Sequence, residues 1–212
     1  MAKKEEGHPD HMKLLILAGL GFLAIALAWL IFAPQPEKGG AATAVGTAAT
    51  GIGNLYSNET FGFDIKLPPG FTVDESYVNT ELGPGKEIPG VSFTIPASLA
   101  SGTNLGVDSY VSIEELDNVV CEPSDFLSVE TTGEPVAIGN NLFMYATSTG
   151  VGAGNIYEES IYITQKGARC YAVRYFIHST EIANYPPGAV RPFDRQKLLA
   201  LFDSVTASLD IH

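Results

Sequence analysis

The feature that most constrains this chain is a run of 20 residues without a charge, between Leu14 and Ala33. An α-helix rises about 1.5 Å per residue, so the run covers about 30 Å, the thickness of a bilayer core. Pro34 and Pro36 follow the run and would end such a helix. The sequence therefore predicts an N-terminal transmembrane helix over residues 14–33, which makes the membrane an expected partner.

The flanking charges predict how this helix is oriented. Lys3, Lys4 and Lys13 precede the run, and Lys38 alone follows it closely. Because basic residues favour the cytoplasmic side, residues 1–13 are predicted to be a cytoplasmic tail and the rest of the chain to lie outside. A cleaved signal peptide is the alternative, although its apolar region would be shorter than this one. Cleavage stays open at this point.

The next segment differs in composition from everything after it. Residues 34–56 contain mainly Ala, Gly and Thr, which cannot bury enough surface to offset the entropy of ordering. We expect a flexible linker there, followed by one extracytoplasmic domain over residues 57–212. A domain of that size can bury a substantial core without help.

The charge balance excludes some partners. The formal net charge is −12, and the part of the chain from Ser57 onward has 20 acidic and 8 basic residues. Nucleic acid is therefore not an expected partner, because phosphate binding needs clustered Lys and Arg. The histidines are His8, His11, His178 and His212, so three of the four lie outside the domain or at its end. We expect no metal site and no cofactor.

Alternating apolar residues predict an antiparallel sheet. Phe61, Phe63, Ile65 and Leu67 share one face, and the Pro-Pro-Gly turn after them predicts a hairpin with a strand from Phe71. Further strands are expected over 91–95, 109–113, 142–148, 156–164 and 169–178. A short helix is expected near 123–127. An amphipathic helix is expected after Asp194, its N-cap, with apolar residues repeating up to Leu209. The predicted fold class is α+β, an antiparallel β-sheet flanked by helices.

The last two strands predict a specific contact. If Lys166 and Gly167 form the turn between them, Glu159 lies directly opposite Arg174. An opposed carboxylate would offset the cost of covering the guanidinium. We therefore expect a structural ion pair between Glu159 and Arg174. Both faces of these strands are largely apolar, which is typical of a strand covered on both sides.

Cys121 and Cys170 are the only cysteines of the chain. Outside the cytoplasm such a pair usually forms a disulfide, and two free buried thiols are the alternative. The bridge would close a loop of about 50 residues, which stabilises the fold by about 4 kcal/mol in the chain-entropy model.

Two further segments could carry function. The loop containing Tyr185, Pro186, Pro187 and Arg191 is stiffened by proline and could present a recognition surface, although a plain connection is the simpler interpretation. His178 lies at the end of a strand beside a serine, but the chain lacks the G-x-S-x-G turn of a hydrolase nucleophile. A histidine hydrogen-bonded to a loop is the favoured interpretation there.

Two stretches resemble known domains. FGFDIKLPPGFTV at 61–73, with VSFTIP at 91–96, resembles the opening of the PsbP/Mog1-like domains, which implies a sandwich of sheet and helices used as an accessory or binding module. AGNIYEESIYI at 153–163 and the segment 169–205 resemble an uncharacterised domain of bacterial envelope proteins. That resemblance implies a bacterial source. With the predicted span and its orientation, we expect the protein in the inner (cytoplasmic) membrane, with its C-terminal domain periplasmic or extracellular.

These observations predict a non-catalytic binding or accessory module of the bacterial envelope, with a protein partner there. An inhibitor of a lytic enzyme, such as a lysozyme or a protease, is the first alternative. A hydrolase is the second, and a pocket with polar groups converging on His178 would favour it.

Overall fold

The computed structural model describes residues 53–118, 120–129 and 131–212. The predicted transmembrane span, the cytoplasmic tail and most of the predicted linker lie outside these residues. Within the described residues, no helix is both long and apolar enough to cross a bilayer. The first described strand, β1 (Asn54–Asn58), begins inside the segment 34–56 that was predicted to be a linker.

A small antiparallel sheet joins two distant parts of the sequence. β2 (Phe63–Leu67) lies between β1 and β11 (Asp210–Ile211). Phe63, Ile65 and Leu67 of β2 are buried, and the intervening Asp64 and Lys66 are not. The alternation read in the sequence therefore describes this strand correctly, because one face of β2 packs on the core and the other faces water.

A larger antiparallel sheet forms the rest of the domain. Its strands follow the order β3-β5-β6-β10-β9-β8-β7, and β4 pairs with β5 beside this path. The strands are β3 (Thr72–Asp74), β4 (Val78–Asn79), β5 (Ile88–Thr94), β6 (Tyr110–Asp117), β7 (Glu134–Ile138), β8 (Asn141–Gly152), β9 (Asn155–Lys166) and β10 (Arg169–Thr180).

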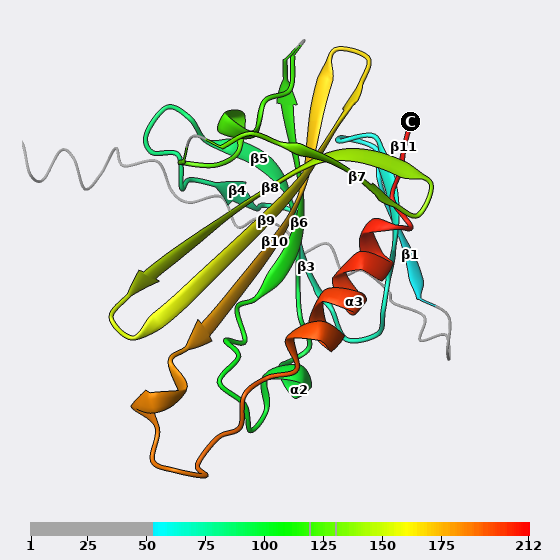
Figure 1. Ribbon diagram of the computed structural model, residues 1–212. Coiled ribbons are helices and arrows are strands. Elements are labelled where there is room, and N and C mark those ends of the chain that lie inside the picture. Colours follow the sequence, from blue (N-terminus) through cyan, green and yellow to red (C-terminus); the bar gives the residue numbers. More distant parts are fainter. Residues whose placement is uncertain (1–52, 119, 130) are drawn as a thin grey trace, which may run out of the picture. The chain divides into compact units, whose positions relative to one another are not determined.

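Both faces of the large sheet are covered. On one face, Val173 and Tyr175 of β10 pack with the buried residues of β2 and with Leu198 and Phe202 of α3 (Arg195–Thr206). Figure 1 shows α3 lying along this side of the sheet. On the other face, a second cluster contains Ile161, Ile163, Cys170 and Ala172 of the sheet, with Phe126 and Leu127 above them. We call residues 121–129 the cover segment.

The predicted α+β class with flanking helices is wrong. The described residues are mostly antiparallel β structure. α3 has 12 residues and α2 (Ala97–Ala100) has four, and two short 3₁₀ turns are added, η1 (Pro123–Asp125) and η2 (Ile182–Asn184). The helix expected near 123–127 is only the 3₁₀ turn η1, and Phe126 and Leu127 directly after it are buried against the sheet. A helix was expected on that second face as well, and the cover segment takes its place.

The predicted hairpin at 61–73 is also wrong. β2 pairs with β1 and β11, whereas β3 pairs with β5 in the large sheet. Pro68, Pro69 and Gly70 do turn the chain, with Gly70 at φ +90°, but the turn leads from one sheet to the other. A local turn signal cannot reveal which sheet its second arm joins, because the partner strand β5 comes later in the sequence.

The β9–β10 register differs from the predicted one by two residues. The turn is Gly167–Ala168, so Arg174 lies opposite Ile161, and Glu159 lies opposite Phe176. A shift of two residues keeps every side chain on its predicted face, because strand side chains alternate with a period of two. Glu159 and Arg174 thus become diagonal neighbours on one face, which long side chains can still bridge.

β8 and β9 extend beyond their predicted ends. Strands were expected over 142–148 and 156–164, but Gly150 and Gly152 also belong to β8 and pair with Tyr157 and Asn155. The turn is reduced to Ala153 and Gly154, which have φ values of +50° and +80°. Two residues with positive φ match the twist of a tight hairpin, so the two strands run on to this turn.

Candidate functional site

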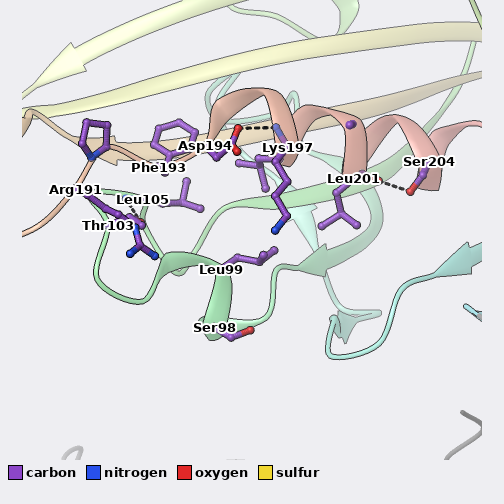
Figure 2. Close-up of a pocket in the computed structure, with 13 residues that line it drawn as sticks. Ser98, Leu99, Thr103, Leu105, Arg191, Phe193, Asp194, Lys197, Leu201 and Ser204 are labelled. Atoms are coloured by element: carbon purple, nitrogen blue, oxygen red, sulfur yellow. Dashed lines mark hydrogen bonds between the residues drawn. The ribbon is translucent and has the colours of Figure 1, made fainter. Parts of the chain in front are cut away.

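A groove of about 750 Å³ lies between α3 and the segment around α2 (Figure 2). This volume falls within the range typical of small-molecule sites, about 300–1,000 Å³. Apolar side chains form much of its lining, and polar and charged side chains join them. The lining residues are Ser98, Leu99, Thr103, Leu105, Arg191, Pro192, Phe193, Asp194, Lys197, Leu198, Ala200, Leu201 and Ser204.

Two cations face the groove without a partner. Figure 2 shows Lys197 extending from α3 toward Leu99, and Arg191 placed beside Thr103. Neither side chain forms a hydrogen bond or an ion pair with any residue in 53–118, 120–129 and 131–212. Both residues are exposed. The groove therefore combines an apolar lining with two available positive charges.

The predicted recognition loop is only partly associated with the groove. The Arg191 N–H donates to the Gly102 carbonyl (3.2 Å), and the Arg191 carbonyl accepts from the Asn104 N–H (3.1 Å). These bonds fix the end of the loop against the α2 segment. Tyr185, Pro186 and Pro187 do not line the groove. Of the four predicted residues, Arg191 alone contributes to it.

Asp194 caps α3, as the sequence indicates. Its Oδ1 accepts a hydrogen bond from the Lys197 N–H at 2.9 Å. The carboxylate thus occupies a donor at the start of the helix, where a negative charge also suits the helix dipole. An anion in the groove would have to rely on the side chains of Arg191 and Lys197.

A second site is a buried ionic cluster on the face below the cover segment. The Arg174 Nε and Nη2 atoms donate to the two carboxylate oxygens of Glu114, at 2.7 and 2.9 Å. Nη2 also donates to the Phe126 carbonyl (2.6 Å), and Nη1 pairs with Glu159. Arg174 and Glu114 are 1% and 0% exposed. The guanidinium is therefore held by two carboxylates and by the cover segment.

Neighbouring polar side chains complete this cluster. Tyr77 Oη and Ser112 Oγ each donate to Glu114 Oε1, at 2.8 and 2.9 Å, and Asn79 Nδ2 approaches both oxygens. Among the described residues, no buried side-chain nitrogen or oxygen lacks a partner. A fully satisfied buried network of this kind fixes one arrangement of the strands that carry it.

Burial and charge shift the pKa values of this cluster. Burial raises the pKa of Tyr77, and the negative charge of Glu114 adds to the rise. Burial also raises the pKa of Tyr110 to about 12. For Arg174, burial acts to lower the pKa, but the Glu114 and Glu159 carboxylates more than reverse this and raise it. The guanidinium stays charged. Burial raises the pKa of Glu159, although Arg174 opposes the rise.

The raised pKa of Glu159 predicts a pH-dependent stability. A carboxyl whose pKa is higher in the folded state than in the unfolded state favours folding below the unfolded pKa of about 4.5, and this contribution is lost as the pH rises through the folded pKa. Glu159→Gln removes this titration and keeps an acceptor for Arg174. The stability of the wild type relative to the variant should fall as the pH rises from below 4.5 toward neutrality, in urea unfolding at each pH. A constant difference would contradict the raised pKa.

Both ring nitrogens of His178 lie within hydrogen-bond distance of polar side chains that hold the ring in place. Its Nδ1 lies 2.8 and 2.9 Å from the two oxygens of Asp108, in the loop before β6, and its Nε2 lies 3.1 Å from Asn155 Oδ1. In a hydrolase triad, Nε2 would face a nucleophile's hydroxyl, and here it faces an amide. His178 also does not line the groove. This geometry gives no support to the hydrolase alternative.

The predicted disulfide between Cys121 and Cys170 is present, with a Cα–Cα distance of 5.6 Å. It joins the cover segment to β10. Cys170 is fully buried. Among the described residues, no group of three or more His, Cys, Asp or Glu side chains is placed to hold a metal ion.

A third feature is an open strand edge. β7 pairs with β8 only at 141–145, so the outer edge of residues 146–152 faces no strand among the described residues. Figure 1 shows this half of β8 at the margin of the sheet. The sequence there, ATSTGVG, has no charge and no proline. Proteins usually protect edges with both, as β7 does with Glu134 and Pro135.

Sequence reasoning missed the residues that most define these sites. Glu114 was not among the predicted site residues, yet it is the main partner of Arg174. Its pairing depends on β6 lying beside β10, which no local pattern reveals. The alternation of Val111 and Ile113 with Ser112 and Glu114 was the available signal, because it places Glu114 on a face of a central strand. Lys197 was not singled out in the sequence either.

No family model matches this sequence, and no curated protein matches it. One similar solved structure is a crystal structure from Bacteroides thetaiotaomicron VPI-5482, with 15% identity and a TM-score of 0.45. That similarity covers 76% of this chain and 48% of the other, so this chain spans about half the length of that protein. Another is the solution structure of cyanobacterial PsbP (CyanoP) from Synechocystis sp. PCC 6803, with 14% identity and a TM-score of 0.35. It covers 79% of this chain and 99% of that one.

A PsbP protein, of the family that residues 61–73 resemble, is thus among the similar solved structures. At this identity and this TM-score, neither likeness supports an assignment of function.

Proposed function

We propose that the domain is a non-catalytic binding module of an extracytoplasmic compartment of the bacterial envelope, and that an extended basic segment of a protein partner adds to the open edge of β8. The observation that carries this proposal is the uncharged, unpaired edge of residues 146–152. Strand addition satisfies the free backbone groups of such an edge and gives affinity without a deep pocket.

The charge of the domain supports a basic partner. Acidic residues outnumber basic ones by 20 to 8 from Ser57 onward. Complementary charge speeds the encounter of two proteins and selects among partners. A second copy of this chain carries the same negative charge and would be repelled, so strand addition between two copies is disfavoured.

The surface beside the edge suits a basic side chain. Gly150 lies opposite Tyr157, and a Cβ at Gly150 would meet only Tyr157 Cβ, at 4.0 Å. The rings of Phe176 and His178 stack on Tyr157 from β10, and on the β8 side Gly150 places no side chain opposite Tyr157. An Arg or Lys of the added strand could cross Gly150 and lie on this ring face, a cation–π contact.

The disulfide supports the proposed compartment. Disulfides persist outside the cytoplasm and are rare within it, where thiols are kept reduced. Cys121 and Cys170 are bridged, and the bridge holds the cover segment over the buried Arg174.

The edge can be tested by charge substitution. Partners captured by the full chain from solubilised bacterial membranes would be identified by mass spectrometry. The partner should then be measured against Thr147→Lys/Thr149→Lys, with Thr80→Lys as the matched control on an exposed loop. Lysines on an edge oppose strand addition, so the double variant should lose at least about tenfold in affinity, and the control should not.

Hydrogen exchange provides a second readout. Partner binding should slow exchange of backbone amides within 146–152. Full binding by the double variant, or slowed exchange only elsewhere, would refute the edge as the docking site. Slowed exchange at this edge in the isolated chain at high concentration would point to pairing between copies and would refute the basic partner.

A further inference from the structure

The lining of the α2–α3 groove offers few hydrogen-bond partners to the backbone of a peptide. The Thr103 hydroxyl donates to the Ala100 carbonyl (2.9 Å), and the Ser204 hydroxyl donates to the Leu201 carbonyl (2.7 Å). Asp194 Oδ1 accepts a hydrogen bond from the Lys197 N–H. An extended peptide would bring backbone N–H and C=O groups into this groove, and buried polar groups without partners are costly. An aliphatic chain requires no such partners.

The groove also has a defined place for one anionic group. Three of the eight basic residues counted from Ser57 form ion pairs, namely Arg169, Arg174 and Arg195, and Lys166 donates to the Ile211 carbonyl. Arg191 and Lys197 have no such partner among the described residues, and they enter the groove from its two walls, the loop and α3 (Figure 2). A carboxylate between them would find complementary charge in an otherwise acidic domain.

From these two observations we propose that the groove binds an amphiphile with one carboxylate head and an aliphatic chain. Arg191 and Lys197 hold the carboxylate. The chain lies over the buried Leu105 and against Leu99 and Leu201, which are partly exposed and whose apolar surface it removes from water. This site is separate from the β8 edge and does not depend on strand addition there, so each proposal can fail without the other.

Dodecanoate is a suitable probe, used below the concentration at which it forms micelles. Titration calorimetry with the full chain should show saturable binding at one site. Acetate has the head without the chain, and dodecanol has the chain without the charge. Both should bind at least about tenfold more weakly, because each lacks one half of the interaction.

Variants locate the binding in the groove. Arg191→Gln/Lys197→Gln should weaken dodecanoate binding by at least about tenfold and leave dodecanol binding nearly unchanged. Lys86→Gln is the matched control, because Lys86 is exposed and lies outside the groove. Leu201→Ser should weaken both ligands. Binding of dodecanoate that the double variant retains in full would refute the site, because it would place the ligand elsewhere on the chain. Tighter binding of a short acidic, leucine-containing peptide than of dodecanoate would refute the amphiphile and identify a peptide groove.

Discussion

Replacing Arg174 with methionine should lower the free energy of unfolding of the domain by about 3–5 kcal/mol. The reason is that the Glu114 carboxylate would stay buried without its cation. Glu114 is fully buried, and Arg174 is the cation that compensates its charge. Methionine fills most of the volume but supplies no charge. Urea unfolding followed by fluorescence would measure the loss, which is a large share of a typical domain stability of about 5–15 kcal/mol.

Two controls make this result specific to the buried cluster. Arg169→Met removes an arginine from the same strand, but its pair with Glu115 is exposed, so the stability should change much less. Arg174→Met combined with Glu114→Leu removes the buried pair and should regain part of the loss, because an apolar replacement of a buried pair is often nearly neutral. The rest of the loss should remain, because the hydroxyls of Tyr77 and Ser112 lose their acceptor and Glu159 loses its cation. Equal effects of Arg174→Met and Arg169→Met would contradict a stabilising role of the cluster.

Removing the disulfide should cost about 4 kcal/mol, from the entropy of closing a loop between residues 49 positions apart. The double variant Cys121→Ser/Cys170→Ala tests this, with alanine chosen at the buried position so that no hydroxyl is left without a partner. Its urea midpoint should match that of the wild type in reductant. The oxidised wild type should be clearly more stable than both.

Thiol labelling tests the bridge itself. The denatured, unreduced protein should show no reactive thiol. Two reactive thiols would contradict the disulfide and, with it, the proposed extracytoplasmic compartment. The losses of stability from Arg174→Met and from removal of the disulfide should also not be additive. The bridge positions the cover segment, whose Phe126 carbonyl accepts a hydrogen bond from Arg174.

The sequence revealed features that depend on nearby residues. The Asp194 cap, the burial of Phe63 and Ile65 and the faces of β9 and β10 all follow from local alternation or spacing. The contact of Glu159 with Arg174 survives a register error of two residues because the period of a strand is two. A register error of one residue would have separated them.

Features that depend on pairings between residues far apart in the chain could not be predicted from the sequence. The strand expected from Phe71 was predicted to pair with β2, but the strand found there, β3, pairs with β5. The partners of β2 are residues 54–58 and 210–211. Flanking helices were expected where the cover segment lies. The groove could not be anticipated either, because Arg191 and Lys197 line one groove only once the loop after β10 is bound to residues 102–104.

The placement of β2 has a consequence for how fast this domain folds. Asp64 pairs with Asp210, and the Lys66 N–H donates to Ser208 Oγ across 142 positions of sequence. Closing so long a loop costs entropy before any contact repays it. Chains dominated by such non-local pairings have a high contact order and fold over milliseconds to seconds. The small sheet can close only when α3 brings residues 208–211 against β2, which makes its assembly a late event in folding.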